Sequence, residues 1–140
     1  MNTLSKSLTY SMLLLVMLPN ALQAQAIADS KGNYYRNETD VKAPSRFSKL
    51  SSGSLWRVVV DELNCRQDKS IFSPVIRTYI ANALLEVEVY RGGSDEVNVN
   101  PLDLNGKPWM PVRGKDSEDV CYVRANSRFI QPATLKRCKW

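Results

Sequence analysis

Apolar and polar side chains alternate along several short stretches between residues 54 and 132. Residues 55–60 are mostly apolar and β-branched, and over residues 85–90 leucine or valine alternates with glutamate or tyrosine. A period of two residues is typical of β-strands, whereas helices repeat about every 3.6 residues. Turn signals at Gly92-Gly93 and Asn105-Gly106 separate these stretches. The pattern predicts an all-β domain with strands over residues 55–60, 63–66, 85–89, 97–99, 109–112 and 120–124.

Residues 73–87 carry two competing patterns. Ile76, Ile80 and Leu84 have helical spacing, and Ser73-Pro74 is typical of a helix start, with a capping serine before proline at the first helical position. The alternation that begins at Leu85 favours a strand instead. We expect a strand here, with a helical turn near Pro74 as the alternative.

The first 26 residues have the features of a signal peptide. Lys6 gives a positively charged start, and residues 11–18 form an apolar run that is too short to span a bilayer. Ala24-Gln25-Ala26 has the small residues that signal peptidase requires, with rival cleavage frames two residues earlier and two residues later. A membrane-anchored N-terminus would need a longer apolar run. We therefore expect a secreted or periplasmic protein without stable membrane insertion after cleavage.

Composition divides the remaining 114 residues into one domain and two flanking segments. Residues 27–53 are polar and lack apolar periodicity, which predicts a flexible linker. Residues 54–132 hold the predicted strands, and residues 133–140 form a basic C-terminal tail that we expect to be mobile. A chain of this length can bury one modest core.

Charge and cysteine content narrow the function further. The formal net charge of +5 suits weak attraction to anionic polymers, but it is also an ordinary solubility charge. No basic run with interleaved aromatic residues is present, and an exported protein does not meet the genome, so no nucleic-acid partner is expected. The three cysteines, Cys65, Cys121 and Cys138, would form disulfides in an oxidising compartment, with one left over. Without histidine or a Cys-x-x-Cys pair, no metal site or cofactor is expected.

Catalysis has few candidate residues. The absence of histidine excludes a Ser-His or Cys-His nucleophile pair. Asp116, Glu118 and Asp119 could supply an acid and a base for a small envelope hydrolase, but carboxylates this close together beside Lys115 are more typical of a solvated loop. We therefore expect no catalytic residues.

Three short motifs in order along the chain resemble the bacterial SH3-like (SH3b) domain: Leu63-Asn64-Cys65-Arg66, then Pro108-Trp109-Met110-Pro111-Val112, then Cys121-Tyr122-Val123-Arg124-Ala125-Asn126 running on to Phe129-Ile130. The resemblance implies a small SH3-like barrel over residues 54–132. Because the first and last strands of such a barrel are neighbours, it also implies a Cys65–Cys121 disulfide that leaves Cys138 over. It further implies a left-handed turn residue, for which Asn82 is suited.

The resemblance also implies a function. Domains of this kind are non-catalytic modules that target cell-wall peptides or other envelope ligands, commonly through an aromatic groove. The residue that the resemblance singles out for this groove is Trp109. Tyr90 and Tyr122, each expected on a strand next to that of Trp109, could join it, and Arg124 could donate hydrogen bonds to the ligand. Trp109 could equally pack in the core, and the tyrosines could merely cover a sheet face.

Two departures from the family pattern matter. Cys121-Tyr122-Val123 stands where Gly-Trp-Val is usual, which places a standard peptidoglycan groove in doubt, and Pro111 interrupts the middle strand. We expect a stand-alone binding module for a cell-wall or envelope component, or else an inhibitor or adaptor that binds another exported protein.

Overall fold

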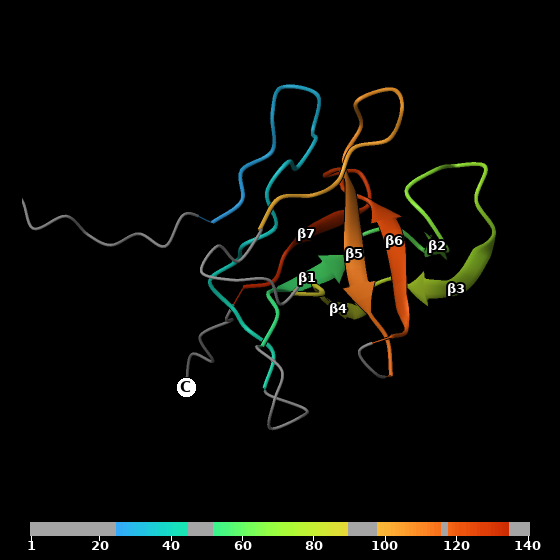
Figure 1. Cartoon of the computed structure of the whole chain (residues 1–140). Coiled ribbons are helices and arrows are strands. Elements are labelled where there is room, and N and C mark those ends of the chain that lie inside the picture. The colour runs from blue at the N-terminus through green and yellow to red at the C-terminus, as the bar shows by residue number, and fades with distance from the viewer. Residues whose placement is uncertain (1–24, 45–51, 90–97, 116–117, 135–140) are drawn as a thin grey trace, which may run out of the picture.

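The computed structural model describes residues 25–44, 52–89, 98–115 and 118–134, and these contain strands and turns but no helix (Figure 1). The expected all-β class is therefore confirmed. The described residues contain seven strands: β1 (Leu55–Val58), β2 (Glu62–Arg66), β3 (Val75–Ile80), β4 (Leu84–Glu86), β5 (Trp109–Arg113), β6 (Val120–Arg124) and β7 (Ile130–Pro132).

The strands form two antiparallel sheets. One sheet has the order β4-β1-β7, and the other has the order β3-β2-β6-β5. A β-bridge between Val87 and Val112 connects the chain just after β4 to the edge strand β5. In addition, the amide of Glu88 donates a 3.0 Å hydrogen bond to the carbonyl of Pro111. The two sheets are thus linked along this edge.

Alternating burial within the strands builds a single apolar core. In β1 and β6 every second side chain is buried, as the sequence alternation predicts. Trp56 is fully buried, its ring meets that of Tyr34 edge-on at 4.7 Å, and its indole N–H donates to the carbonyl of Asn37 at 3.0 Å. The core gathers side chains from both sheets, including Val58, Leu85, Met110, Val123 and Ile130.

A disulfide crosses this core between β2 and β6. The structure joins Cys65 to Cys121, with their Cα atoms 5.4 Å apart, and both residues are fully buried. The two strands are neighbours, with Arg66 paired to Tyr122. The structure therefore holds the pairing that the family resemblance implies, while Cys138 lies outside the described residues.

Residues 75–86 form two strands joined by a tight turn, so the helical alternative is wrong. Asn82 occupies the turn with φ 69°, the left-handed conformation expected for this residue. Its amide donates to the carbonyl of Val58, which ties the turn to β1. The residue at the predicted second turn, Gly106, also has positive φ, 75°.

Pro111 is accommodated because β5 is an edge strand. The amide of Trp109 donates away from β6, to the carbonyl of Pro101, and strand alternation turns the nitrogen of residue 111 to the same outer side. No ladder hydrogen bond to β6 is lost.

Two other strands differ from the prediction. Residues 85–89 were predicted as one strand but are paired only in part, and β7 was not predicted.

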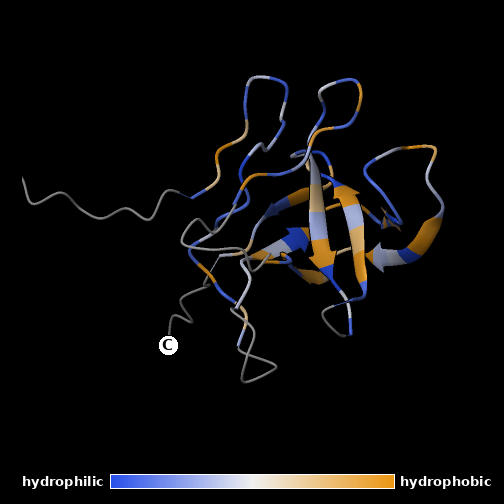
Figure 2. Cartoon of the chain, viewed as in Figure 1, coloured by the Kyte–Doolittle hydropathy of each residue, from blue (hydrophilic) through white to orange (hydrophobic). Residues whose placement is uncertain are grey.

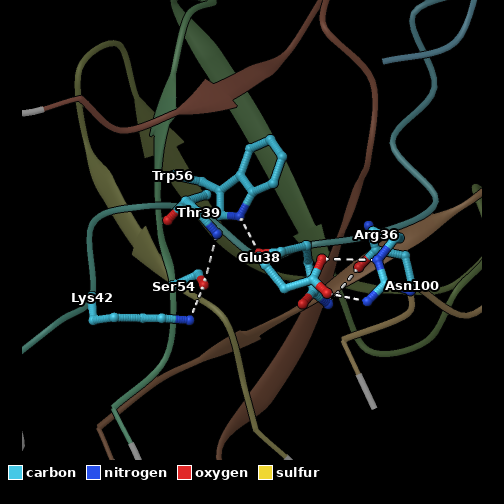
Figure 3. Close-up of polar contacts among 8 residues, drawn as sticks. Arg36, Glu38, Thr39, Lys42, Ser54, Trp56 and Asn100 are labelled. Carbon is cyan, nitrogen blue, oxygen red and sulfur yellow. Dashed lines mark hydrogen bonds and ion pairs between the residues drawn. The ribbon is translucent and has the colours of Figure 1, made fainter. Parts of the chain in front are cut away.

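The segment 25–44 differs from the expected flexible linker because it packs on the domain. β-Bridges pair Asn33 with Asn126, Arg36 with Val99 and Lys42 with Ser54, and Tyr34, Asn37 and Thr39 are buried. Figure 3 shows Ser54 accepting hydrogen bonds from the amide of Thr39 and from Lys42. The segment is held by isolated bridges and by polar side chains. Such contacts require no regular spacing of apolar residues, so the sequence carries no periodic signal for them. The folded unit thus begins well before residue 54.

Other boundaries are described only in part. Ala26, the last residue of the expected signal peptide, is buried, and its amide donates to the carbonyl of Glu38 at 2.8 Å. At the other end, Ala133 is buried and bonded to Leu55. Residues 1–24 and 135–140 lie outside the described residues, as does the Gly92-Gly93 turn.

Candidate functional site

A hollow of about 610 Å³ lies over the outer face of the four-stranded sheet. The pairing of the strands shows which side chains form the floor of the hollow. Arg124 of β6 pairs with Trp109 of β5. Arg66 of β2 pairs with Tyr122, which lies two residues before Arg124 on the same face of β6. Three loops and the segment around Lys31 rise around this floor. The lining comprises Lys31, Asn33, Glu62, Leu63, Asn64, Arg66, Ile71, Asp103, Asn105, Lys107, Trp109, Arg124, Asn126, Arg128 and Phe129.

Trp109 forms a buried wall of the hollow. It is only 2% exposed, yet it lies outside the main apolar cluster of the core. Its indole N–H donates a 3.0 Å hydrogen bond to Oδ2 of Asp103, while Oδ1 of that carboxylate accepts the amides of Asn105 and Lys107. The ring is therefore fixed in place, with little of its face open for a ligand to stack on.

The carboxylate of Asp103 is held in its charged form. Partial burial on its own would raise its pKa, but the hydrogen bonds from Trp109, Lys107 and Asn105, together with the charge of Arg124, lower the pKa below its ordinary value. This carboxylate thus stabilises the turn and fixes the indole of Trp109, and its oxygens are occupied by these interactions.

Arg124 lies at the centre of a polar network that joins the N-terminal segment to the sheet. Its guanidinium donates to the carbonyl of Pro108 and to Oδ1 of Asn33, both at 2.7 Å. The same Asn33 oxygen accepts from Nδ2 of Asn126 at 3.0 Å. Burial lowers the pKa of Arg124 from its ordinary value, although that value lies so far above neutrality that the side chain keeps its charge.

The lining of the hollow is cationic. It contains five lysine or arginine residues but only two carboxylates, those of Glu62 and Asp103. Lys31, Lys107 and Arg128 are exposed at the rim, so their charges face solvent. A hollow with this charge attracts anionic groups, and its asparagine amides offer further hydrogen bonds to polar ligands.

The structure brings together two of the four ligand-binding residues expected from the sequence. Trp109 and Arg124 both line the hollow. Tyr122 lies on the same sheet face but does not line it, and Tyr90 lies outside the described residues. Asn33 and Asn126 were missed. Asn33 falls in the segment expected to be flexible, and no local pattern links two asparagines 93 residues apart.

The candidate acid and base residues do not form a catalytic pair. Asp119 makes an ion pair with Arg77, and this interaction together with the amide of Lys115 lowers its pKa. Glu118 is exposed, and Asp116 lies outside the described residues. Within the described part of the chain no group of three or more cysteine, aspartate or glutamate residues could hold a metal ion. No membrane-spanning helix occurs among these residues either.

A second, smaller hollow of about 410 Å³ lies beside a buried ion cluster. Arg113 of β5 donates to Glu88 at 2.7 Å and to Glu86 at 2.9 Å, and all three side chains are nearly inaccessible to solvent. The cluster binds the end of β4 and the residues after it to β5. We assign it a structural role, because its charged atoms face one another across the junction of the sheets.

Comparison of the chain with protein-family models, with curated proteins and with solved structures found no match. The functional inference therefore depends on the geometry of the hollow.

Proposed function

We propose that this protein is an exported, non-catalytic binding protein that holds an anionic cell-wall or envelope ligand in the hollow over β2, β6 and β5. The observation that supports this most directly is the excess of cationic side chains in the lining, set around amide groups and one fixed tryptophan. The disulfide between β2 and β6 is consistent with an oxidising compartment.

We also propose that the domain is an SH3-like barrel. The neighbouring positions of β2 and β6, the left-handed Asn82 turn and the placement of Trp109 on the strand beside β6 agree with the family pattern. Domains of this kind commonly bind through an aromatic groove, and Trp109 lines the hollow here.

The burial of Trp109 changes how the site would recognise its ligand. With its indole ring covered, Trp109 shapes the hollow and anchors the 102–108 turn, while recognition depends on the rim charges and amides. Trp109→Ala should therefore destabilise the whole domain by about 3–5 kcal/mol, the ordinary cost of removing a buried tryptophan. It is unsuitable as a test of binding.

Binding is best tested by removing charge at the rim. Purified peptidoglycan is incubated with the mature protein, and bound protein is measured after sedimentation. In the double variant Lys107→Gln, Arg128→Gln we expect the dissociation constant to rise at least tenfold, because two exposed charges at the hollow are lost. The matched control Lys69→Gln, Lys115→Gln removes the same charge from exposed side chains that do not line this hollow, and it should bind like the wild type.

Two results would contradict the proposal. Equal loss of binding in both double variants would mean that net charge alone drives retention. Release of soluble fragments from the peptidoglycan, lost in Asp119→Asn, would mean that the protein is a hydrolase.

A further inference from the structure

The mouth of the hollow is flanked by two loop tips that expose large apolar side chains. In the 67–74 loop, Phe72 is 90% exposed and Ile71, which also lines the hollow, is 61% exposed. In the 102–108 turn, Leu104 is completely exposed, between the lining residues Asp103 and Asn105. Figure 2 shows apolar colour at both tips, apart from the core. Exposed side chains of this size on two loops around one site indicate an interaction surface.

The 67–74 loop is braced so that its apolar tip stays outside. The amide of Gln67 donates to the carbonyl of Pro74 across its base, and the amide of Asp68 donates to Oγ of Ser73, both at 2.8 Å. The guanidinium of Arg66 donates to the carbonyl of Ser73 at 2.9 Å. Phe72 is thus held outward by the backbone of its own loop.

The 102–108 turn is braced in the same way. The amide of Asp103 donates to the carbonyl of Lys107 at 2.9 Å, and the amide of Gly106 donates back to the carbonyl of Asp103 at 3.0 Å. The Asp103 carboxylate caps two further amides. Both tips are therefore formed before any partner arrives, so little conformational entropy is lost on docking.

We propose that this face docks on an anionic lipid bilayer, with Phe72 and Leu104 entering the interfacial region and a lipid headgroup occupying the cationic hollow between them. The inference rests on the proposed function and specifies the source of its anionic ligand. Charge complementarity favours a bilayer: the polar hollow carries a net excess of three cations and lies between apolar tips. A membrane surface presents the matching order, with anionic headgroups above an apolar layer.

Flotation with lipid vesicles tests this docking. The mature protein is mixed with vesicles of phosphatidylglycerol and phosphatidylethanolamine, or of phosphatidylcholine alone, and the partition coefficient is measured. We expect binding to the anionic vesicles that falls as salt is raised, and at least tenfold weaker binding to phosphatidylcholine. The double variant Phe72→Ser, Leu104→Ser should lower the partition coefficient at least tenfold.

The matched control is Ile80→Ser, Leu84→Ser, since these side chains are 70% and 60% exposed but lie outside the lining of the hollow. This variant should partition like the wild type. Equal loss in both double variants, or no vesicle binding by the wild type, overturns the inference. A dimer in light scattering without vesicles that dissociates in the Phe72→Ser, Leu104→Ser variant also overturns it, because the tips would then meet a second copy.

Peptidoglycan sedimentation with the same proteins separates this inference from the proposed function. Retention on peptidoglycan without vesicle binding agrees with the proposed function and contradicts only the inference that this face docks on a lipid bilayer. Vesicle binding that is unchanged in Lys107→Gln, Arg128→Gln would show that the hollow takes no lipid headgroup and would overturn this inference. The role of the hollow in the proposed function is decided by the peptidoglycan retention of the same variant.

Discussion

Loss of the Cys65–Cys121 disulfide should remove a large part of the stability of this protein. The bond joins residues 56 positions apart in the sequence. For a closed loop of that size, chain-entropy arguments give a change of about 14 cal/mol/K in the unfolded state, equivalent to about 4 kcal/mol at 25 °C. Domains of this size have a total free energy of unfolding of about 5–15 kcal/mol. Without the bond, the protein should be marginally stable.

Urea unfolding followed by tryptophan fluorescence measures this loss, because Trp56 and Trp109 are buried in the folded state. Three samples are compared, all carrying Cys138→Ser to prevent thiol exchange: the oxidised protein, the same protein reduced, and Cys65→Ala, Cys121→Ala. The reduced sample keeps both sulfur atoms, so it isolates the effect of the bond. The alanine variant also loses buried side-chain volume and should be the least stable.

Two quantities should change on reduction. The free energy of unfolding should fall by about 4 kcal/mol, and the denaturant slope should rise because the unfolded chain expands when the loop opens. A difference below about 1 kcal/mol between the oxidised and reduced samples would refute the chain-entropy argument for this bond. In the wild-type protein, peptide mapping that joins Cys138 to either of the other cysteines would refute the pairing itself.

Three further predictions follow from single contacts. Gly53→Ala should destabilise the fold severely, because the added methyl group would overlap a backbone carbonyl. Gly106→Ala places its methyl group in open space and should cost only about 1 kcal/mol, from strain at the positive φ. Thermal melting compares the midpoints of the two variants. The pKa of Asp103 is lower in the folded state than in the unfolded state, so its carboxylate stabilises the fold fully above the unfolded pKa, and this stabilisation is lost as the pH falls through the folded pKa. The difference in free energy of unfolding between the wild type and Asp103→Asn, measured by urea titration, should therefore close below about pH 4. Mass spectrometry of exported protein should find an N-terminus at Gln25, because cleavage two residues later would remove the buried Ala26. An intact chain would refute export, and an N-terminus at residue 27 would refute cleavage after Ala24.

The strands were predictable wherever one face of the chain is buried and the other is solvated. β6 has the predicted bounds because its side chains alternate between core and surface. β5 extends the prediction by one residue; all five of its side chains are buried, so the Asn105-Gly106 turn before it, rather than alternation, marked where it begins. Asn82 was predictable as well, since few residues other than glycine accept its backbone conformation.

The N-terminal segment and much of the site were not predictable by the same means. Residues 25–44 are held by isolated bridges, by the buried amide of Asn37 and by the ring of Tyr34 against Trp56, none of which repeats along the sequence. Trp109 and Arg124 were found through a family resemblance. Asn33, the partner of Arg124, lies 91 residues away, and only the folded chain brings the two together. Asp103 lies six residues before Trp109, but its contact with the indole depends on the conformation of the turn between them.

The bond network that joins Asn33 to Asn126 also has a consequence for the order of folding. These side chains are 93 residues apart, and β6, the inner strand between β2 and β5, begins only at residue 120. A chain that ends before β6 therefore lacks the strand between β2 and β5, the second cysteine for Cys65 and the Asn126 side chain that binds Asn33. Contacts between such distant residues form slowly, and the fold is completed only after β6 has been synthesised. For the export proposed above, this delay would favour translocation of the chain before it folds.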